Sequence, residues 1–194
     1  MNQKVKLLLV TALSLVVIIG AYVLYNYLGN EFAASQLATT PQNTENVEDD
    51  TTSADNRAPD FTVYDAQGNP INLSDFLGKP VILNFWASWC GPCKSEMPDF
   101  QKAYEKYGNE IAFLIVNMTD GSQETVETAS SFIEKAGYTF PVYFDSSSDA
   151  AIQYGVRTIP TTFFIDAQGN FVAWANGAMD LSMLEQGIDM IVQH

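Results

Sequence analysis

Cys90 and Cys93 are the only cysteines in this chain of 194 residues, and they stand in the tetrapeptide Cys90-Gly91-Pro92-Cys93. Two cysteines so placed can form either a structural disulfide or a dithiol that exchanges disulfides with other molecules. A disulfide that closes so short a loop removes little entropy from the unfolded chain. The spacing therefore favours a redox-active disulfide, Cys90–Cys93, over a structural one.

Other cysteine chemistries lack partners in the sequence. A zinc site usually needs four ligands, yet there is no second cysteine pair, and the one histidine is the last residue, His194. A terminal histidine is also a poor general base for a Cys–His hydrolase. A peroxidase of the peroxiredoxin type would need a cysteine in a Pro-x-x-x-Thr-x-x-Cys setting, which the sequence lacks. We therefore expect neither a metal nor a cofactor at the site.

The elements around the pair favour a reactive thiolate. A continuous apolar run at 80–86 predicts a strand buried on both faces, and 93–107 has the periodicity of a helix. Cys90 then lies at a helix N-terminus, where free N–H groups and the helix dipole stabilise negative charge. Cys93 lies one turn later on the same face. Pro92 suits a first helical turn, and Gly91 adds no bulk beside the attacking sulfur.

The rest of the pattern predicts an α/β domain. Strands are expected at 61–64, 80–86, 111–116, 141–144, 161–165 and 171–175, and helices at 93–107, 124–136, 150–154 and 181–192. Alternating strands and helices that finish as a hairpin across 166–170 indicate a central mixed sheet with helices on both faces. The strand at 61–64 and the turn at 66–70 predict an N-terminal β-hairpin before that sheet.

The N-terminal third has a different character. The run 7–28 is apolar, carries no charge and is long enough for one transmembrane helix, a signal anchor. Lys4 and Lys6 precede it, so the positive-inside rule places the tail 1–6 in the cytoplasm and the rest of the chain outside. The acidic stretch 29–57 is expected to be a flexible linker, and 58–194 to be one domain. The alternative is a cleaved signal peptide with a site near 32–35; both predict export.

The overall charge excludes one class of partner. The chain has nine Lys and Arg residues and 23 Asp and Glu residues, so its net charge is −14. Nucleic-acid binding requires a basic surface that neutralises phosphates. We therefore expect no nucleic-acid partner.

The motif and its flanks resemble the thioredoxin superfamily, in particular its TlpA/ResA-like branch of membrane-anchored, extracytoplasmic thiol–disulfide oxidoreductases. The segments that carry the resemblance are Phe85 to Lys94 around the cysteines, Ala58 to Phe61, Leu73 to Phe76, Lys94 to Pro98, Gly155 to Thr161 and Asp166 to Gly169. The resemblance spans 58–194 and implies a thioredoxin-like fold.

The resemblance also assigns roles to residues outside the tetrapeptide. It implies a cis peptide bond at Pro160, opposite the disulfide, where Ile159 and Pro160 bind the extended chain of a partner. Glu96 is expected to influence the thiols and to accept the proton of Cys93, and Trp89 to form an exposed platform. Asn84 stands where cytosolic thioredoxin has a buried aspartate, so that proton acceptor is absent or its role has passed to Glu96.

For function, the resemblance implies reduction of disulfides in exported proteins, with apocytochrome c as the leading target. A membrane electron source of the CcdA/DsbD type is the expected partner that returns the enzyme to its dithiol form. The alternatives are an oxidase or isomerase that makes or reshuffles disulfides, and a redox-silent binding module that only borrows the fold.

Overall fold

The structure, a computed structural model, describes Gly20, Ala38–Thr39 and residues 56–192. The expected transmembrane run 7–28, apart from Gly20, and most of the expected linker lie outside the described residues. Within the described part of the chain, none of the helices combines the length and the apolar character that crossing a bilayer would take.

One mixed sheet organises the domain. Its strands are β1 (Ala38–Thr39), β2 (Thr62–Tyr64), β3 (Pro70–Asn72), β4 (Val81–Trp86), β5 (Ala112–Asn117), β6 (Val142–Phe144), β7 (Thr161–Ile165) and β8 (Phe171–Asn176). They lie in the order β1-β8-β7-β4-β5-β6-β2-β3. The neighbours β4, β5 and β6 are parallel, whereas β7, β8 and the β2–β3 hairpin pair antiparallel. The predicted mixed sheet with an N-terminal hairpin is confirmed.

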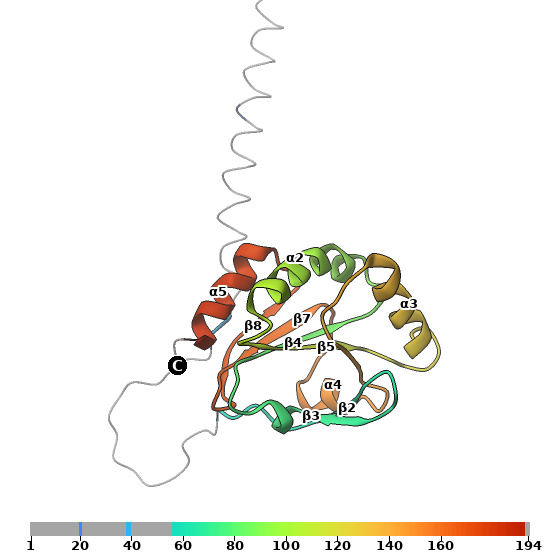
Figure 1. Ribbon diagram of the computed structural model, residues 1–194, viewed down its shortest axis with the longest axis horizontal. Coiled ribbons are helices and arrows are strands. Elements are labelled where there is room, and N and C mark those ends of the chain that lie inside the picture. The colour runs from blue at the N-terminus through green and yellow to red at the C-terminus, as the bar shows by residue number, and fades with distance from the viewer. Residues whose placement is uncertain (1–19, 21–37, 40–55, 193–194) are drawn as a thin grey trace, which may run out of the picture. The chain divides into compact units, whose positions relative to one another are not determined.

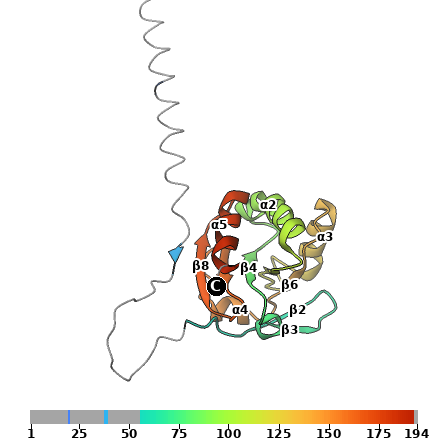
Figure 2. The same cartoon turned by 60° about the vertical axis from the view of Figure 1, so that its left-hand side comes forward.

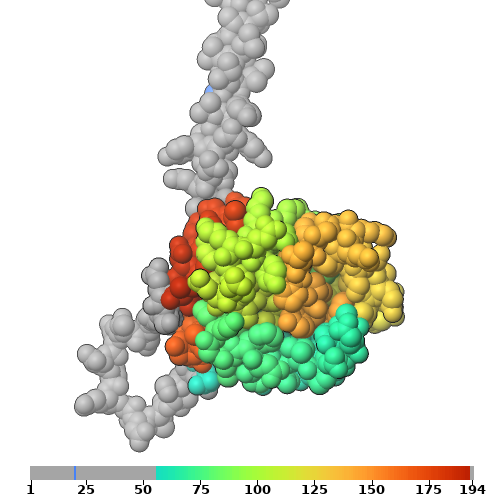
Figure 3. Space-filling view, in the orientation of Figure 1, coloured from blue at the N-terminus to red at the C-terminus, as the bar shows by residue number. Residues whose placement is uncertain are grey.

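Helices cover both faces of this sheet (Figures 1 and 2). The helices are α2 (Gly91–Tyr107), α3 (Val126–Ala136), α4 (Asp149–Gln153) and α5 (Leu181–Val192), with a short 3₁₀ helix at Leu73–Phe76. In the space-filling view, α2 lies between α5 and α3 on one side, and the β2–β3 segment forms the other side (Figure 3). The site described below lies where β4 leads into α2.

The central strand β4 serves both halves of the core, because successive side chains of a strand point to opposite faces. Ile82 and Trp86 join the cluster under α2 and α5, whereas Leu83 and Phe85 join the cluster that contains Tyr154. All six residues of β4 are buried. The continuous apolar run predicted this double burial, and the one polar residue in it, Asn84, is buried as well.

Helix α5 approaches the sheet closely at Gly187. A Cβ atom at this position would collide with the ring of Phe164 on β7. A glycine inside a helix costs stability relative to alanine, so its presence here reflects the close approach of helix and strand.

The start of one helix differs from the prediction. The sequence pattern places Glu124 at the beginning of a helix over 124–136, but α3 begins at Val126. The reason is the cap: Thr125 is extended, and its hydroxyl accepts a hydrogen bond from the Thr128 N–H. Glu124 therefore precedes the helix, and its side chain is buried.

Candidate active site

The redox pair lies at the N-terminus of α2, as predicted. Cys90 is the N-cap residue, and Cys90 and Cys93 form a disulfide with a Cα–Cα distance of 5.3 Å. The backbone N–H of Cys93 donates a hydrogen bond of 3.2 Å to Cys90 Sγ. Pro92 occupies the first turn, where its missing N–H costs nothing. The sulfur of Cys90 therefore sits where a helix stabilises negative charge.

The two sulfurs differ in their surroundings. Cys93 is fully buried, and Cys90 is 5% exposed. Gly91 and Pro92 are exposed beside them, and Trp89 is 50% exposed, as expected of a surface platform. An incoming molecule can therefore approach the pair only from the side of Cys90.

The loop before β7 faces the disulfide. The Ile159–Pro160 peptide bond is cis, in agreement with the expectation from the resemblance. The carbonyl oxygen of Ile159 lies 3.8 Å from Cys90 Sγ. This places the backbone of Ile159 directly beside the sulfur of Cys90.

Glu96 is a buried carboxyl group close to the pair, with an exposed fraction of 1%. It lies three residues after Cys93 and thus on the same face of α2. One carboxyl oxygen accepts a hydrogen bond from Asn84 Nδ2 (2.9 Å), and the other accepts one from the Met179 N–H (3.1 Å). Burial raises the pKa of Glu96 to about 8, although these two hydrogen bonds act in the opposite direction. Glu96 therefore holds a proton at neutral pH in the oxidised protein.

Asn84 connects Glu96 to the sheet. Its Nδ2 donates to Glu96 and also to the hydroxyl of Thr162 on β7, both at 2.9 Å. Within residues 56–192, its Oδ1 is buried without a hydrogen-bond partner. The side chain thus fixes one oxygen of Glu96 without supplying a charge.

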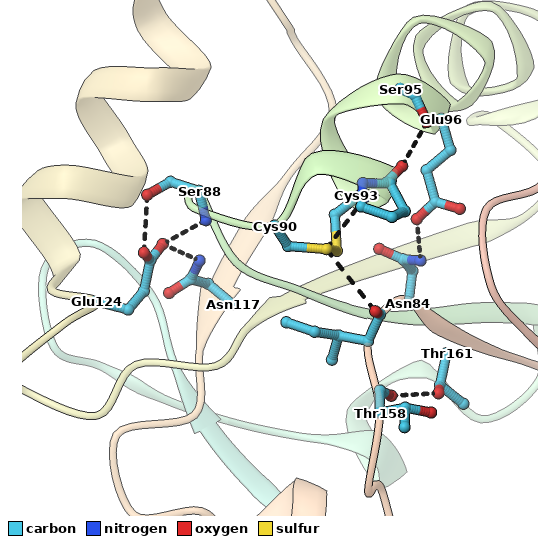
Figure 4. Close-up of a disulfide and its surroundings, with 12 residues drawn as sticks. Asn84, Ser88, Cys90, Cys93, Ser95, Glu96, Asn117, Glu124, Thr158 and Thr161 are labelled. Atoms are coloured by element: carbon cyan, nitrogen blue, oxygen red, sulfur yellow. Dashed lines mark hydrogen bonds between the residues drawn. A yellow bond between two sulfur atoms is a disulfide. The ribbon is translucent and has the colours of Figure 1, made fainter.

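A second buried carboxylate, Glu124, lies on the other side of the disulfide (Figure 4). Its Oε1 accepts hydrogen bonds from the Ser88 N–H (2.8 Å) and from Asn117 Nδ2 (2.7 Å). Its Oε2 accepts one from the Ser88 hydroxyl (2.7 Å). Ser88 stands two residues before Cys90, so this carboxylate holds the loop that carries the accessible sulfur.

The structure brings together all the residues that the sequence predicts for the site: Cys90, Cys93, Glu96, Trp89, Gly91, Pro92, Ile159 and Pro160. Sequence reasoning did not identify Glu124, Ser88, Asn117 or Thr162. A polar residue at the end of a buried strand, Asn117, was the available signal, because a buried amide requires hydrogen-bond partners.

Comparison with known proteins agrees with this geometry. Residues 54–173 match the AhpC/TSA family. The thiol–disulfide oxidoreductase ResA of Halalkalibacterium halodurans is 31% identical over 180 residues, which are 92% of each chain.

Two solved structures extend the comparison. Bacillus subtilis StoA is 30% identical with a TM-score of 0.59, covering 68% of this chain and 97% of its own. The exposed lipoprotein thioredoxin of Streptococcus pneumoniae is 33% identical with a TM-score of 0.57, covering 68% and 99%. The chain therefore belongs to the AhpC/TSA family of thioredoxin-like proteins, and within it is a thiol–disulfide oxidoreductase of the ResA type.

Proposed function

We propose that this enzyme reduces disulfides in exported proteins, with Cys90 as the nucleophile and Cys93 as the resolving thiol. The observation that carries the proposal is the combination of a buried Cys93 with a buried Glu96, three residues later on α2, whose pKa is raised to about 8. A resolving thiol enclosed with its own proton acceptor suits an enzyme that must release a reduced target rapidly.

In the first step, the Cys90 thiolate attacks a disulfide of the target. One target sulfur leaves as a thiolate, and the other forms a mixed disulfide with Cys90. The extended chain of the target lies along Ile159 and Pro160, whose backbone borders the accessible sulfur. Trp89 offers an exposed apolar surface beside it.

In the second step, the Glu96 carboxylate takes the proton of Cys93. The Cys93 thiolate attacks Cys90 Sγ, the enzyme disulfide forms, and the second target sulfur leaves as a thiolate. The target gains two electrons and the enzyme loses two. The raised pKa of Glu96 makes its carboxylate a stronger base than an ordinary carboxylate, which favours this transfer. Glu96 then keeps the proton in the oxidised protein.

Direction and targets follow from the Gly91-Pro92 dipeptide and from the resemblance to ResA-type enzymes. Thioredoxin has a reduction potential of about −270 mV, and the oxidant DsbA has one of about −120 mV. A Gly-Pro dipeptide between the two cysteines resembles thioredoxin. We propose apocytochrome c as the leading target. The competing function is an oxidase or isomerase of exported proteins, and a redox-silent binding module is a weaker alternative that the intact cysteine pair disfavours.

The membrane arrangement is part of the proposal. Residues 7–28 anchor the chain, 1–6 remain in the cytoplasm, and a linker over 29–57 carries the domain 58–194 outside the cell membrane. The charge-free apolar run and the two preceding lysines support this arrangement. A membrane thiol-electron source of the CcdA/DsbD type would then reduce the Cys90–Cys93 disulfide.

Two measurements test the proposal. Equilibration of the full chain with dithiothreitol or glutathione buffers should give a reduction potential near that of thioredoxin; a value near that of DsbA would favour the oxidase. The Cys93→Ser variant should accumulate a mixed disulfide with an oxidised target peptide, whereas Cys90→Ser should accumulate none. Full target reduction by Cys90→Ser would contradict the assigned roles.

A further inference from the structure

The carboxylate of Glu124 is fully buried, yet the groups that bind it are uncharged. Its Oε1 receives two N–H groups, from Ser88 and Asn117, and neither could accept a proton in return. The Asn117 amide is oriented by its other end, because its Oδ1 accepts a hydrogen bond from the Thr119 hydroxyl at 2.8 Å. All three hydrogen bonds to this carboxyl group come from uncharged donors, and within residues 56–192 no positively charged side chain is paired with it.

Hydrogen bonds within the loop that contains Glu124 fix its conformation. Oδ1 of Asp120 accepts hydrogen bonds from the backbone N–H groups of Ser122, Gln123 and Glu124. The carbonyl oxygen of Glu124 accepts two more, from the N–H groups of Asp120 and Gly121. This loop thus delivers the carboxylate to the active site at a fixed position.

Hydrogen bonds also fix the segment that Glu124 binds, from Ala87 to Cys90. Ser88 is bound to Glu124 through both its N–H and its hydroxyl, and the Cys90 N–H donates to the Ala87 carbonyl at 3.1 Å. Glu124 therefore fixes the turn from β4 into α2, and with it the sulfur that attacks the target.

We propose that Glu124 is a positioning residue for Cys90 and that its buried charge opposes the Cys90 thiolate, which makes the enzyme a stronger reductant. The inference rests on the proposed redox function. A nearby like charge disfavours an anion, and a destabilised thiolate shifts the equilibrium from dithiol to disulfide. The enzyme then gives up its electrons more readily.

Other charged groups are Lys94 and Glu96 in the first six residues of α2, Asp120 in the Glu124 loop and Arg157 in the segment before Ile159. The helix N-terminus at Cys90 acts in the opposite direction to Glu124, because it stabilises the thiolate. The variants below leave all of these groups unchanged, so a difference between them reports on Glu124 and its contact with Ser88.

The test compares Glu124→Gln, which removes the charge, with Ser88→Ala, which removes one hydrogen bond and keeps the charge. The pKa of the Cys90 thiol is measured in the reduced full chain from the pH dependence of its alkylation. Glu124→Gln should lower this pKa by about 0.5 or more, and Ser88→Ala should leave it near the wild-type value. Above the thiol pKa, the dithiol form of Glu124→Gln should be favoured about threefold in glutathione buffers.

An unchanged thiol pKa in Glu124→Gln, or an equal change in Ser88→Ala, would overturn the proposal. If Glu124→Gln does not fold, carboxyl ¹³C spectra of the reduced wild-type protein provide the test. The Glu124 resonance should move when Cys90 ionises, and a flat titration would contradict the coupling. Failure of the reductase function itself would appear separately, as a wild-type enzyme that does not reduce its target.

Discussion

The carboxyl group of Glu96 and the side-chain amide of Asn84 are joined by a buried hydrogen bond of 2.9 Å. The amide contributes a donor but no charge, so burial dominates and raises the pKa of Glu96 to about 8. This relationship yields three predictions that distinguish a proton acceptor from a structural carboxyl group.

The first prediction concerns the rate of target release. In Glu96→Gln, attack of Cys93 on the mixed disulfide should slow roughly 100-fold near neutral pH, because the proton acceptor is missing. The rate should then rise with hydroxide concentration. Stopped-flow measurement of reduced peptide release tests this. Glu105→Gln, an exposed position on the same helix, is the control, and equal rates in both variants would rule out the role of Glu96.

The second prediction concerns stability and pH. The pKa of Glu96 is about 8 in the folded, oxidised protein and near the ordinary value of 4.5 in the unfolded chain. The folded state therefore binds the extra proton between these values, and stability from this group is lost as the pH rises from about 4.5 to 8. The free energy of unfolding should fall by about 1.4 kcal/mol at most for each pH unit in this range. Denaturant unfolding at several pH values should show this decline in the wild type and a flatter profile in Glu96→Gln; equal slopes would contradict the raised pKa.

The third prediction concerns Asn84→Asp. The substitution places a second carboxyl group against Glu96, and two buried carboxylates at hydrogen-bond distance cannot both ionise easily. The pair should titrate in two steps, with the upper apparent pKa above that of Glu96 in the wild type. Carboxyl ¹³C titration measures both steps. Asn109→Asp adds the same charge at an exposed position and should leave Glu96 unchanged.

A fourth prediction concerns the contact between α5 and β7. Gly187→Ala forces a Cβ atom against the ring of Phe164, and overpacking of this kind costs about 1–3 kcal/mol. Gln186→Ala, its exposed neighbour on α5, should change the free energy of unfolding by less than about 0.5 kcal/mol. Urea denaturation of the two variants gives the comparison, and equal values would show that α5 shifts freely to make room.

The local parts of this architecture could be predicted from the sequence. The apolar run of β4 and the helical periodicity after it located the redox pair, because hydrophobic periodicity is a local property. The antiparallel pairing of β7 with β8 could be predicted from the turn at 166–170 that joins them. The resemblance, rather than residue chemistry, supplied the cis bond at Pro160.

The surroundings of the two buried carboxyl groups, Glu96 and Glu124, could be found only from the tertiary structure. The position of Glu96 beside the disulfide follows from helical spacing, but its desolvation depends on the segment of Met179, 83 residues away. Glu124 reaches Ser88 across 36 residues and was predicted to start a helix. Thr125 is a residue type that favours the N-cap position, but no local signal indicates that the side chain of Glu124 before it turns inward.

The unequal burial of the two sulfurs restricts the kinetics of the whole cycle. Because Cys93 is enclosed and Cys90 borders the surface, a target disulfide and the thiol that later reduces the enzyme must both react at the same atom and occupy the same surface. The two reactants then exclude each other, so no ternary complex forms. Turnover should follow a double-displacement scheme, with parallel double-reciprocal plots, and an excess of either reactant should inhibit the half-reaction of the other.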